Sequence, residues 1–447
     1  MNARNRELLA LVPASLLVAA GFAAVFISRK DLLGGLDGTN EISNASLTYG
    51  GMFLALCFAT HVVIRFTLPH ADPYLFPLVA MLASFGLVEI YRISDAFAGK
   101  QAFSFLLGLG VFAATIIVFR DYQVLERYRY VIAMVGLGLL FLPSFFPTVN
   151  GAHLSIRLGS FEAQPAEFAK IAIVVFLASY LRDTRQLMVI AGRRFLGITV
   201  PPLKHFGPLL VVWGAAMVLL FFIKDIGSSL MFFGALLAMI YVATNRISFV
   251  LVGLLLFLAG AMLLAGQVGH IQGRIDAWQD PFDPALYNQQ TGGSYQLAQG
   301  LFAQADGGIL GQGFGGAVLD LPRAYCPDGQ VICSLLPAPH TDFVYAVIVN
   351  ELGLVGAAGL LIVYLLIVQR GMKIAVLARD SFSKLLAAGL TCVFALQVFV
   401  IIGGVTKVIP LTGVTLPFVS YGGSSVMANF VLLALLLLIS NKARREA

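Results

Sequence analysis

The sequence contains few charged residues. Asp, Glu, Lys and Arg make up 12% of its 447 residues and hydrophobic residues 59%, whereas soluble globular proteins carry about 25% charged and 45–50% apolar residues. This scarcity of charge excludes a soluble enzyme and a disordered chain, and four cysteines in so long a chain exclude a small disulfide-stabilised scaffold. The composition, with a mean hydropathy of +0.89, is typical of a protein that crosses a membrane many times.

Long apolar runs, by contrast, are abundant. A helix needs about 20 largely apolar residues to cross the hydrocarbon core of a membrane. About twelve segments meet this requirement: 8–28, 46–67, 73–92, 101–119, 129–147, 165–181, 207–223, 226–244, 247–267, 342–369, 382–404 and 420–440. We therefore predict an all-α, polytopic membrane protein with about twelve transmembrane helices.

The basic residues predict how the chain is oriented. The net charge of +6 would suggest nucleic-acid binding in a soluble domain, but in a membrane protein such an excess marks cytoplasmic loops. An even number of spans places both termini on one side, and most of the 29 Lys and Arg residues lie on that side, including those of 182–206 and of the basic tail 442–447. We expect cytoplasmic termini and no nucleic-acid partner.

The longest polar connection, 268–341, then lies outside the membrane on the opposite face, between helices 9 and 10. Loops of this length are usually functional or disordered, and we favour function because the segment is neither low-complexity nor highly charged. Its Gly-rich stretch 307–316 predicts tight turns or a close approach of the backbone to a bulky ligand. Cys326 and Cys333 either form a disulfide or stay reduced.

Ionisable residues near apolar spans are the candidates for chemistry, because a charge inside a membrane costs roughly 2.5–3.5 kcal/mol. Glu167 and Lys170 are three residues apart, so a helix places them on one face, where they can pair. They form either a structural ion pair or a substrate contact. Asp342 follows Pro339 where the polar loop becomes a span, so it is either a helix N-cap or a general base.

Several motifs, in order along the chain, carry a family resemblance. They are Asn150-Gly151-Ala152, the run from Gln164 to Lys170, Lys224-Asp225-Ile226-Gly227, the Gly-rich stretch, His340-Thr341-Asp342-Phe343, Glu351-Leu352-Gly353 and the Pro/Gly-rich segment 409–425. Together they cover roughly 73–441, and the sequence resembles the SEDS family (shape, elongation, division and sporulation), whose members include RodA and FtsW.

The resemblance implies a peptidoglycan glycosyltransferase that polymerises lipid II at the outer face of the bacterial plasma membrane. It implies a ten-helix core over 69–441 preceded by two extra helices over 1–68, an arrangement more similar to RodA-type elongation proteins than to FtsW-type division proteins. It also implies a class B penicillin-binding protein as the partner, and Asp342 as the catalytic carboxylate.

The chemistry of the implied substrate predicts further site residues. Displacement of an α-linked pyrophosphate to form a β-1,4 bond inverts the anomeric centre, so a base must take the proton of the attacking hydroxyl and cations must stabilise the leaving group. Lys407 and Arg157 are the candidate cations, a divalent ion (Mg²⁺ or Mn²⁺) is the one cofactor left open, and Glu167, Lys170, Asp225 and Thr341 complete the predicted substrate-binding set. The alternatives are a transporter, such as a lipid II flippase, an FtsW-type polymerase and a non-catalytic scaffold.

Overall fold

The computed structural model describes most of the chain. The described residues are 3–32, 39–147, 155–158, 161–190, 193–195, 198–200, 225–265, 269–287, 293–322 and 332–446, together with isolated positions between 210 and 218. The motif residues 150–153, Lys224 and Cys326 therefore lie outside the described residues. Cys57 and Cys392 are free thiols, and the pairing of Cys326 with Cys333 stays a prediction.

Helices dominate the fold. In chain order they are α1 (Ala3–Ala10), α2 (Val12–Leu32), α3 (Thr39–Thr67), α4 (Leu75–Ile93), α5 (Asp95–Val118), α6 (Val124–Arg127), α7 (Arg129–Phe141), α8 (Ala166–Ile190), α10 (Ile226–Thr244), α11 (Ile247–Ala265), α12 (Gly269–Gln279), α13 (Pro284–Tyr287), α14 (Tyr295–Gly307), α15 (Val344–Leu377), α16 (Ser381–Val405) and α17 (Gly423–Arg445). The strands form short antiparallel hairpins: β1 (Ile156–Leu158) with β2 (Phe161–Ala163), β3 (Arg193–Phe195) with β4 (Ile198–Val200), and β5 (Asp320–Pro322) with β6 (Ile332–Ser334).

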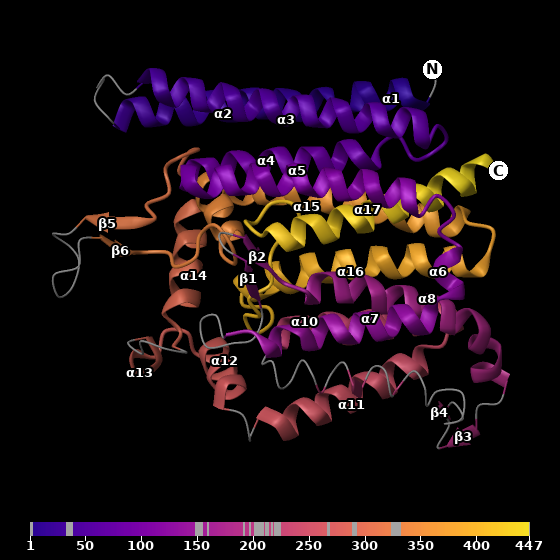
Figure 1. The fold of residues 1–447 in the computed structure, drawn as a ribbon. Coiled ribbons are helices and arrows are strands. Elements are labelled where there is room, and N and C mark those ends of the chain that lie inside the picture. The colour runs from indigo at the N-terminus through magenta and orange to yellow at the C-terminus, as the bar shows by residue number, and fades with distance from the viewer. Residues whose placement is uncertain are drawn as a thin grey trace.

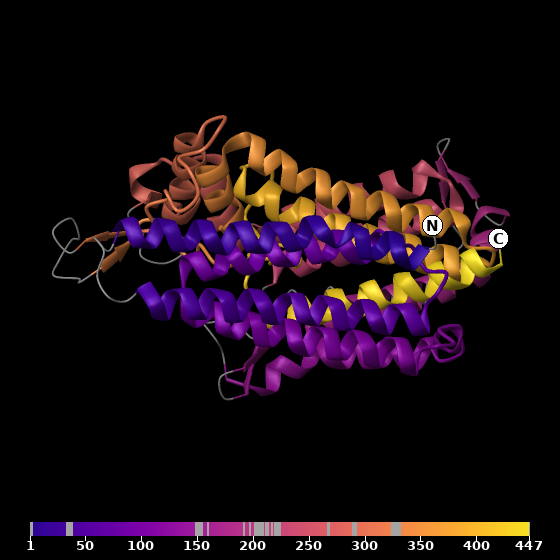
Figure 2. The same ribbon diagram turned by 90° about the horizontal axis from the view of Figure 1, so that it is seen from above.

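The long helices run side by side along one direction, and the polar elements gather at the two ends of the bundle. The helices α12 to α14 and the β5–β6 hairpin lie at one end, and both termini lie at the other (Figures 1 and 2). The loop 268–341 and the termini are therefore at opposite ends, as the predicted topology requires. The predicted tail from 442 continues α17, whose last turn carries Lys442, Arg444 and Arg445, where positive charge favours the helix C-terminus.

The described residues hold eight helices that are long and apolar enough to cross a membrane, and shorter apolar helices at Arg129–Phe145 and Ile247–Ala259. This confirms the prediction of a polytopic α-helical fold, and the predicted span 226–244 coincides with α10. The predicted span 165–181 lies within α8, and 207–223 falls largely outside the described residues. The total of about twelve spans stays a prediction.

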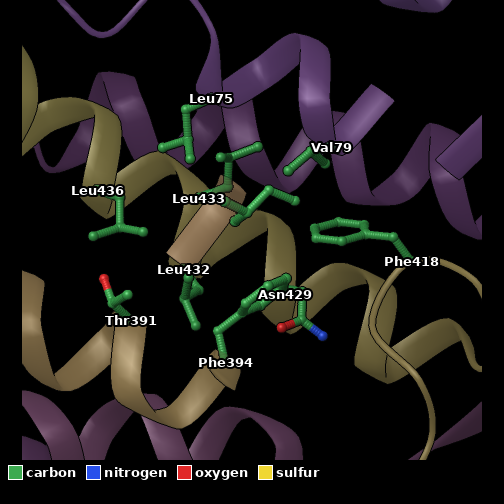
Figure 3. A pocket seen from close by; sticks show the side chains of 10 residues that line it. Leu75, Val79, Thr391, Phe394, Phe418, Asn429, Leu432, Leu433 and Leu436 are labelled. Carbon is green, nitrogen blue, oxygen red and sulfur yellow. The ribbon is translucent and has the colours of Figure 1, made fainter. Parts of the chain in front are cut away.

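The C-terminal helix α17 lies at the centre of the bundle. It packs along α5, where the aromatic ring of Phe430 meets Phe105 and Phe112 edge to face. Among the described residues, a cavity of about 10 Å³ remains between α4, α16 and α17, lined mostly by apolar side chains and bordered by Asn429 (Figure 3). A space of that size holds one water molecule at most, so this cavity is too small to be a substrate site.

The N-terminal helices are fastened to the core by buried polar contacts at the end that carries the termini. Arg4 pairs with Glu7 and donates to the carbonyl of Ala71, while His61 Nδ1 lies 2.7 Å from Glu7 Oε1. Asp72 pairs with Arg444 of α17. Charges buried in this way require partners, so these contacts tie α1 and α3 to the start of α4 and to the C-terminal helix.

The helix α15 is broken at Gly353, and the Gly-rich stretch fills the break. Gly353 has φ 66° and ψ −171°, a backbone conformation open almost only to glycine. The interrupted ladder is completed from outside: Gln312 N donates to Asn350 O (2.9 Å), and Leu354 N donates to Gly308 O (3.0 Å). The glycines do permit a close approach, but here the backbone approaches α15 rather than a ligand.

Gly353→Ala tests this break. A Cβ at Gly353 would lie 2.3 Å from Ile309 O, and a positive φ costs a non-glycine residue about 1–3 kcal/mol. We expect Gly353→Ala to lower the thermal unfolding temperature of the detergent-purified protein clearly. Gly359→Ala is the matched control, because nothing lies within 4 Å of its Cβ position and alanine favours a helix. Equal unfolding temperatures for the two variants would refute the account of the break.

Candidate active site

The segment 410–422 between α16 and α17 is non-helical and lies against the start of α15. Ser420 Oγ accepts a hydrogen bond from Leu416 N (2.9 Å) and donates to Thr341 O (2.7 Å). Tyr421 N donates to His340 O (2.8 Å). The structure therefore brings together two motifs whose bonded residues Thr341 and Ser420 are 79 residues apart in the sequence. Thr341 contributes its backbone carbonyl to their junction.

Gln101 of α5 holds the same segment from the other side. Its Nε2 donates to Ser420 O (3.1 Å), and its Oε1 accepts from Gly422 N (3.4 Å). Gln101 is fully buried. A neutral amide inside an apolar run carries no charge signal, so the sequence analysis missed it.

An aromatic stack fixes His340 beside this junction. The imidazole lies flat against the Phe97 ring, with a centroid distance of 4.1 Å and an interplanar angle of 15°, and Tyr421 meets it edge on. Burial lowers the pKa of His340. The imidazole is therefore neutral at neutral pH and acts as a packed support for the chain that leads into Asp342.

Asp342 is not a helix cap. Within the described part of the chain, α15 has Phe343 at its N-cap position and no side-chain capping bond. Asp342 is partly exposed, and its Oδ2 faces Gly413, whose Cβ would lie 3.7 Å away. Burial raises the pKa of Asp342 to about 6, although the positive charge of Arg274 acts in the opposite direction. The geometry therefore gives no support to the N-cap interpretation, and the role of Asp342 as a general base stays a prediction.

Arg274 of α12 is the cation that the structure places near Asp342. Its Nη1 donates to Leu411 O (3.1 Å), and it interacts electrostatically with both Asp225 and Asp342. Burial lowers the pKa of Arg274, and the two carboxylates oppose that shift. The sequence analysis missed this residue. The available signal was that the loop 268–341 holds only two basic residues, Arg274 and Arg323.

Lys407 supports α12 rather than contacting Asp342. It has a positive φ of 61° at the end of α16, and its Nζ donates to Gln279 O (3.2 Å). Its own carbonyl accepts from Trp278 Nε1 (3.1 Å). These bonds, with that of Arg274, dock α12 onto the turn before 410–422. A leaving-group contact by Lys407 stays a prediction.

Asp225 caps α10. Its Oδ1 accepts from Ser228 N (2.9 Å) and its Oδ2 from Ser228 Oγ (2.5 Å), as is usual for an aspartate at a helix start. The neighbouring Gly227 allows the helix to approach the 410–422 segment, because a Cβ there would lie 2.4 Å from Val414 Cγ2. The capping bonds account for Asp225 without a ligand, and its predicted role in substrate binding stays a prediction.

Glu167 and Lys170 form the expected pair. Lys170 Nζ donates to Glu167 Oε2 and to Gln397 Oε1, both at 2.6 Å, and the three side chains are buried. Gln397 Nε2 in turn donates to Thr415 O (3.0 Å). The pair therefore supports the 410–422 segment through Gln397, a contact that fits the structural alternative.

Arg157 lies apart from Asp342 in β1. Its Nε is 3.9 Å from Glu162 Oε2, and its side chain is 61% exposed. The hairpin itself is tied to α17, since Gln164 N donates to Ser424 Oγ (2.7 Å). Arg157 is thus largely exposed, and its contact with the leaving group stays a prediction.

The described residues contain no group of three or more His, Cys, Asp or Glu side chains that could hold a metal ion. The predicted divalent ion therefore has no ligand set among them, and it stays a prediction. Asp225 and Asp342 each interact electrostatically with Arg274.

A paired substitution separates the two interpretations of Glu167 and Lys170. Glu167→Ala leaves a buried lysine without its carboxylate, which typically costs about 3–5 kcal/mol, so we expect poor folding and little activity. Glu167→Ala with Lys170→Ala should restore the thermal unfolding temperature. If activity returns with stability, the pair is structural. A stable but inactive double variant would show instead that the pair contacts substrate.

Comparison with known proteins identifies the family. Residues 71–445 match the family model FTSW_RODA_SPOVE, described as "Cell cycle protein". "Peptidoglycan glycosyltransferase RodA" of Mycobacterium leprae (strain TN) is 40% identical over 451 residues, which cover 99% of this chain and 91% of that protein. "Probable peptidoglycan glycosyltransferase FtsW" of Geobacter metallireducens is 32% identical over 380 residues, which cover 82% of this chain and 94% of that protein.

A solved structure shares the fold. It is described as "Structural coordination of polymerization and crosslinking by a peptidoglycan synthase complex", and it matches with a TM-score of 0.64 at 24% identity, covering 84% of this chain and 99% of that one. The names of the relatives support the glycosyltransferase interpretation over the transporter. The predicted SEDS resemblance is confirmed: the chain belongs to the FtsW/RodA/SpoVE family of cell cycle proteins.

Proposed function

We propose that this protein is a RodA-type peptidoglycan glycosyltransferase that polymerises lipid II into β-1,4-linked glycan strands for cell elongation. The observation that carries the proposal is the state of Asp342, a partly exposed carboxylate that caps no helix in the described chain and interacts electrostatically with Arg274. RodA of Mycobacterium leprae matches almost the whole chain, including the region of α1 to α3 that precedes the family match, whereas the FtsW relative covers less of it.

Asp342 is the general base in this proposal. The 4-hydroxyl of the acceptor sugar attacks the anomeric carbon of the donor, and its proton passes to the carboxylate as the new C–O bond forms and the bond to pyrophosphate breaks. A general base works best when its pKa is near the working pH. With a pKa of about 6, Asp342 is ionised at neutral pH and is more basic than an ordinary aspartate, whose pKa is about 3.9.

Arg274 stabilises the departing pyrophosphate. A guanidinium offers several donors in a planar fork that suits phosphate oxygens. The helix α12 carries this one, which interacts electrostatically with both Asp225 and Asp342. Its bond to Leu411 O uses one donor nitrogen, which leaves other N–H groups for a ligand. Lys407 and Arg157 are secondary candidates, because Lys407 supports α12 and Arg157 is exposed at the same end.

The site belongs to the outer face of the plasma membrane. The termini lie at the opposite end of the bundle from α12 to α14. The sequence predicts most of the Lys and Arg residues on the side of the termini, and positively charged segments remain in the cytoplasm. The lipid tail of the substrate requires a site at the membrane boundary, where Asp342 precedes the span Val344–Leu377. A class B penicillin-binding protein is the proposed partner, in keeping with the synthase complex that shares this fold.

Asp342→Asn distinguishes the polymerase from the transporter and the scaffold. The amide preserves the size of the side chain but cannot accept the proton, so glycan synthesis from lipid II should fall by about 100-fold or more, while folding and partner binding stay normal. The measurement is strand formation by the protein purified with its transpeptidase partner. Asp380→Asn is the matched control, since Asp380 caps α16 by accepting from Ser383 N (2.8 Å) and asparagine caps equally well. Near-normal synthesis by folded Asp342→Asn would refute the assignment.

A further inference from the structure

Arg92 occupies an unusual place at the end of α4. Its guanidinium is almost buried, with Nη2 2.5 Å from Glu351 Oε1 of α15. The same Nη2 donates to Ala317 O at 2.7 Å. A single arginine on a third element therefore joins the helix α15 to the Gly-rich stretch that fills its break.

Glu351 completes this joint. Its side chain is fully buried, and its Oε2 accepts a hydrogen bond from Gly315 N at 2.9 Å. A carboxylate inside a membrane protein is tolerated only when it is paired and hydrogen-bonded. Glu351 obtains both from Arg92 and the 315–317 backbone, so the ion pair and the loop conformation depend on each other.

Glu89 is a second acidic residue near Arg92, but the arginine pairs with Glu351. Glu89 lies one turn before Arg92 on α4 and is fully buried, and neither of its carboxyl oxygens has a hydrogen-bond partner among the described residues. An ionised carboxylate in that setting would be very costly, so the neutral acid is the form that the surroundings accommodate. The positive charge of Arg92 then neutralises one negative charge, that of Glu351.

The contacts of Arg92 with Glu351 and Ala317 lie at one end of a short helical piece, and Asp342 precedes the other end. The break at Gly353 separates 344–352 from the rest of α15, leaving a piece about 13 Å long with Asp342 just before one end and Glu351 near the other. Asp342 comes directly before the N-cap residue Phe343. Because the backbone connects it to this piece, a change in the tilt of the piece moves Asp342. A tilt of about 5° moves the far end by about 1 Å, and a misplacement of that size can cost about 100-fold in rate.

We propose that Arg92 is a positioning residue for polymerisation: by bridging Glu351 and Ala317 it locks the Gly-rich stretch into the break of α15 and thereby fixes the place of Asp342. This inference rests on the proposed function. Arg92 touches none of the groups around Asp342, so its effect on the reaction passes through the orientation of 344–352.

Two variants test the inference without leaving an unpaired charge. Arg92→Lys keeps the charge but lacks the planar fork, and Arg92→Gln with Glu351→Gln removes both charges together. For each we expect kcat of lipid II polymerisation to fall at least tenfold, with KM within about twofold of the parent. Faster hydrogen exchange is expected at the amides of Gln312 and Gly313, which donate to Asn350 O and Glu351 O. Arg120→Lys is the matched control at an exposed arginine, and it should change neither the kcat of polymerisation nor the hydrogen exchange of these amides.

The outcomes separate the two proposals. A wild-type protein that forms no strands would refute the proposed function itself. If the wild type is active and both variants keep its kcat, the positioning role is wrong, whatever happens to their stability. A loss that follows only the folded fraction, with unchanged exchange at Gln312 and Gly313, would also refute it.

Discussion

Backbone polar groups inside a membrane must find their partners within the protein, and the site depends on how this fold meets that requirement. The segment 410–422 abandons helical geometry next to the start of α15, so its amides and carbonyls need other partners. Gln101, Gln397 and the hydroxyl of Ser420 supply them. Gln101 comes from α5 and Gln397 from α16, while the hydroxyl of Ser420 bonds to Thr341 O just before α15. The packing of the bundle and the shape of the site are therefore determined together.

The same requirement explains the break in α15. Gly353 interrupts the helical ladder, and the freed groups bond to the 308–313 backbone. The break leaves a short helical piece, 344–352, that begins beside Asp342. Ser420 contacts the chain just before this piece, and Arg92 contacts Glu351 near its other end. A continuous helix would have placed Asp342 by the tilt of the whole span. The fold instead places it by local contacts, which suits a base that must meet a hydroxyl within hydrogen-bond reach.

The sequence predicted the polytopic α-helical fold, because apolar runs of fixed length are a strong signal. The prediction 226–244 for α10 is an example. It also predicted the Glu167–Lys170 pair, because helical spacing places the two charges together. It could not predict Gln101 or Arg274, since long-range contacts leave no periodic pattern. The Gly-rich stretch was recognised as a place of close approach, but only the fold shows that the partner is α15.

The central claim is that Asp342, a partly exposed carboxylate with a raised pKa, is the base. The pH dependence of kcat/KM tests this claim most directly, because this ratio reports the free enzyme. Since the active form is the ionised Asp342, whose pKa is about 6, activity should be level above pH 7 and fall about tenfold per unit below pH 6. The measurement is the initial rate of lipid II polymerisation by the purified complex between pH 5 and 8. A rate that stays level down to pH 5 would contradict the account.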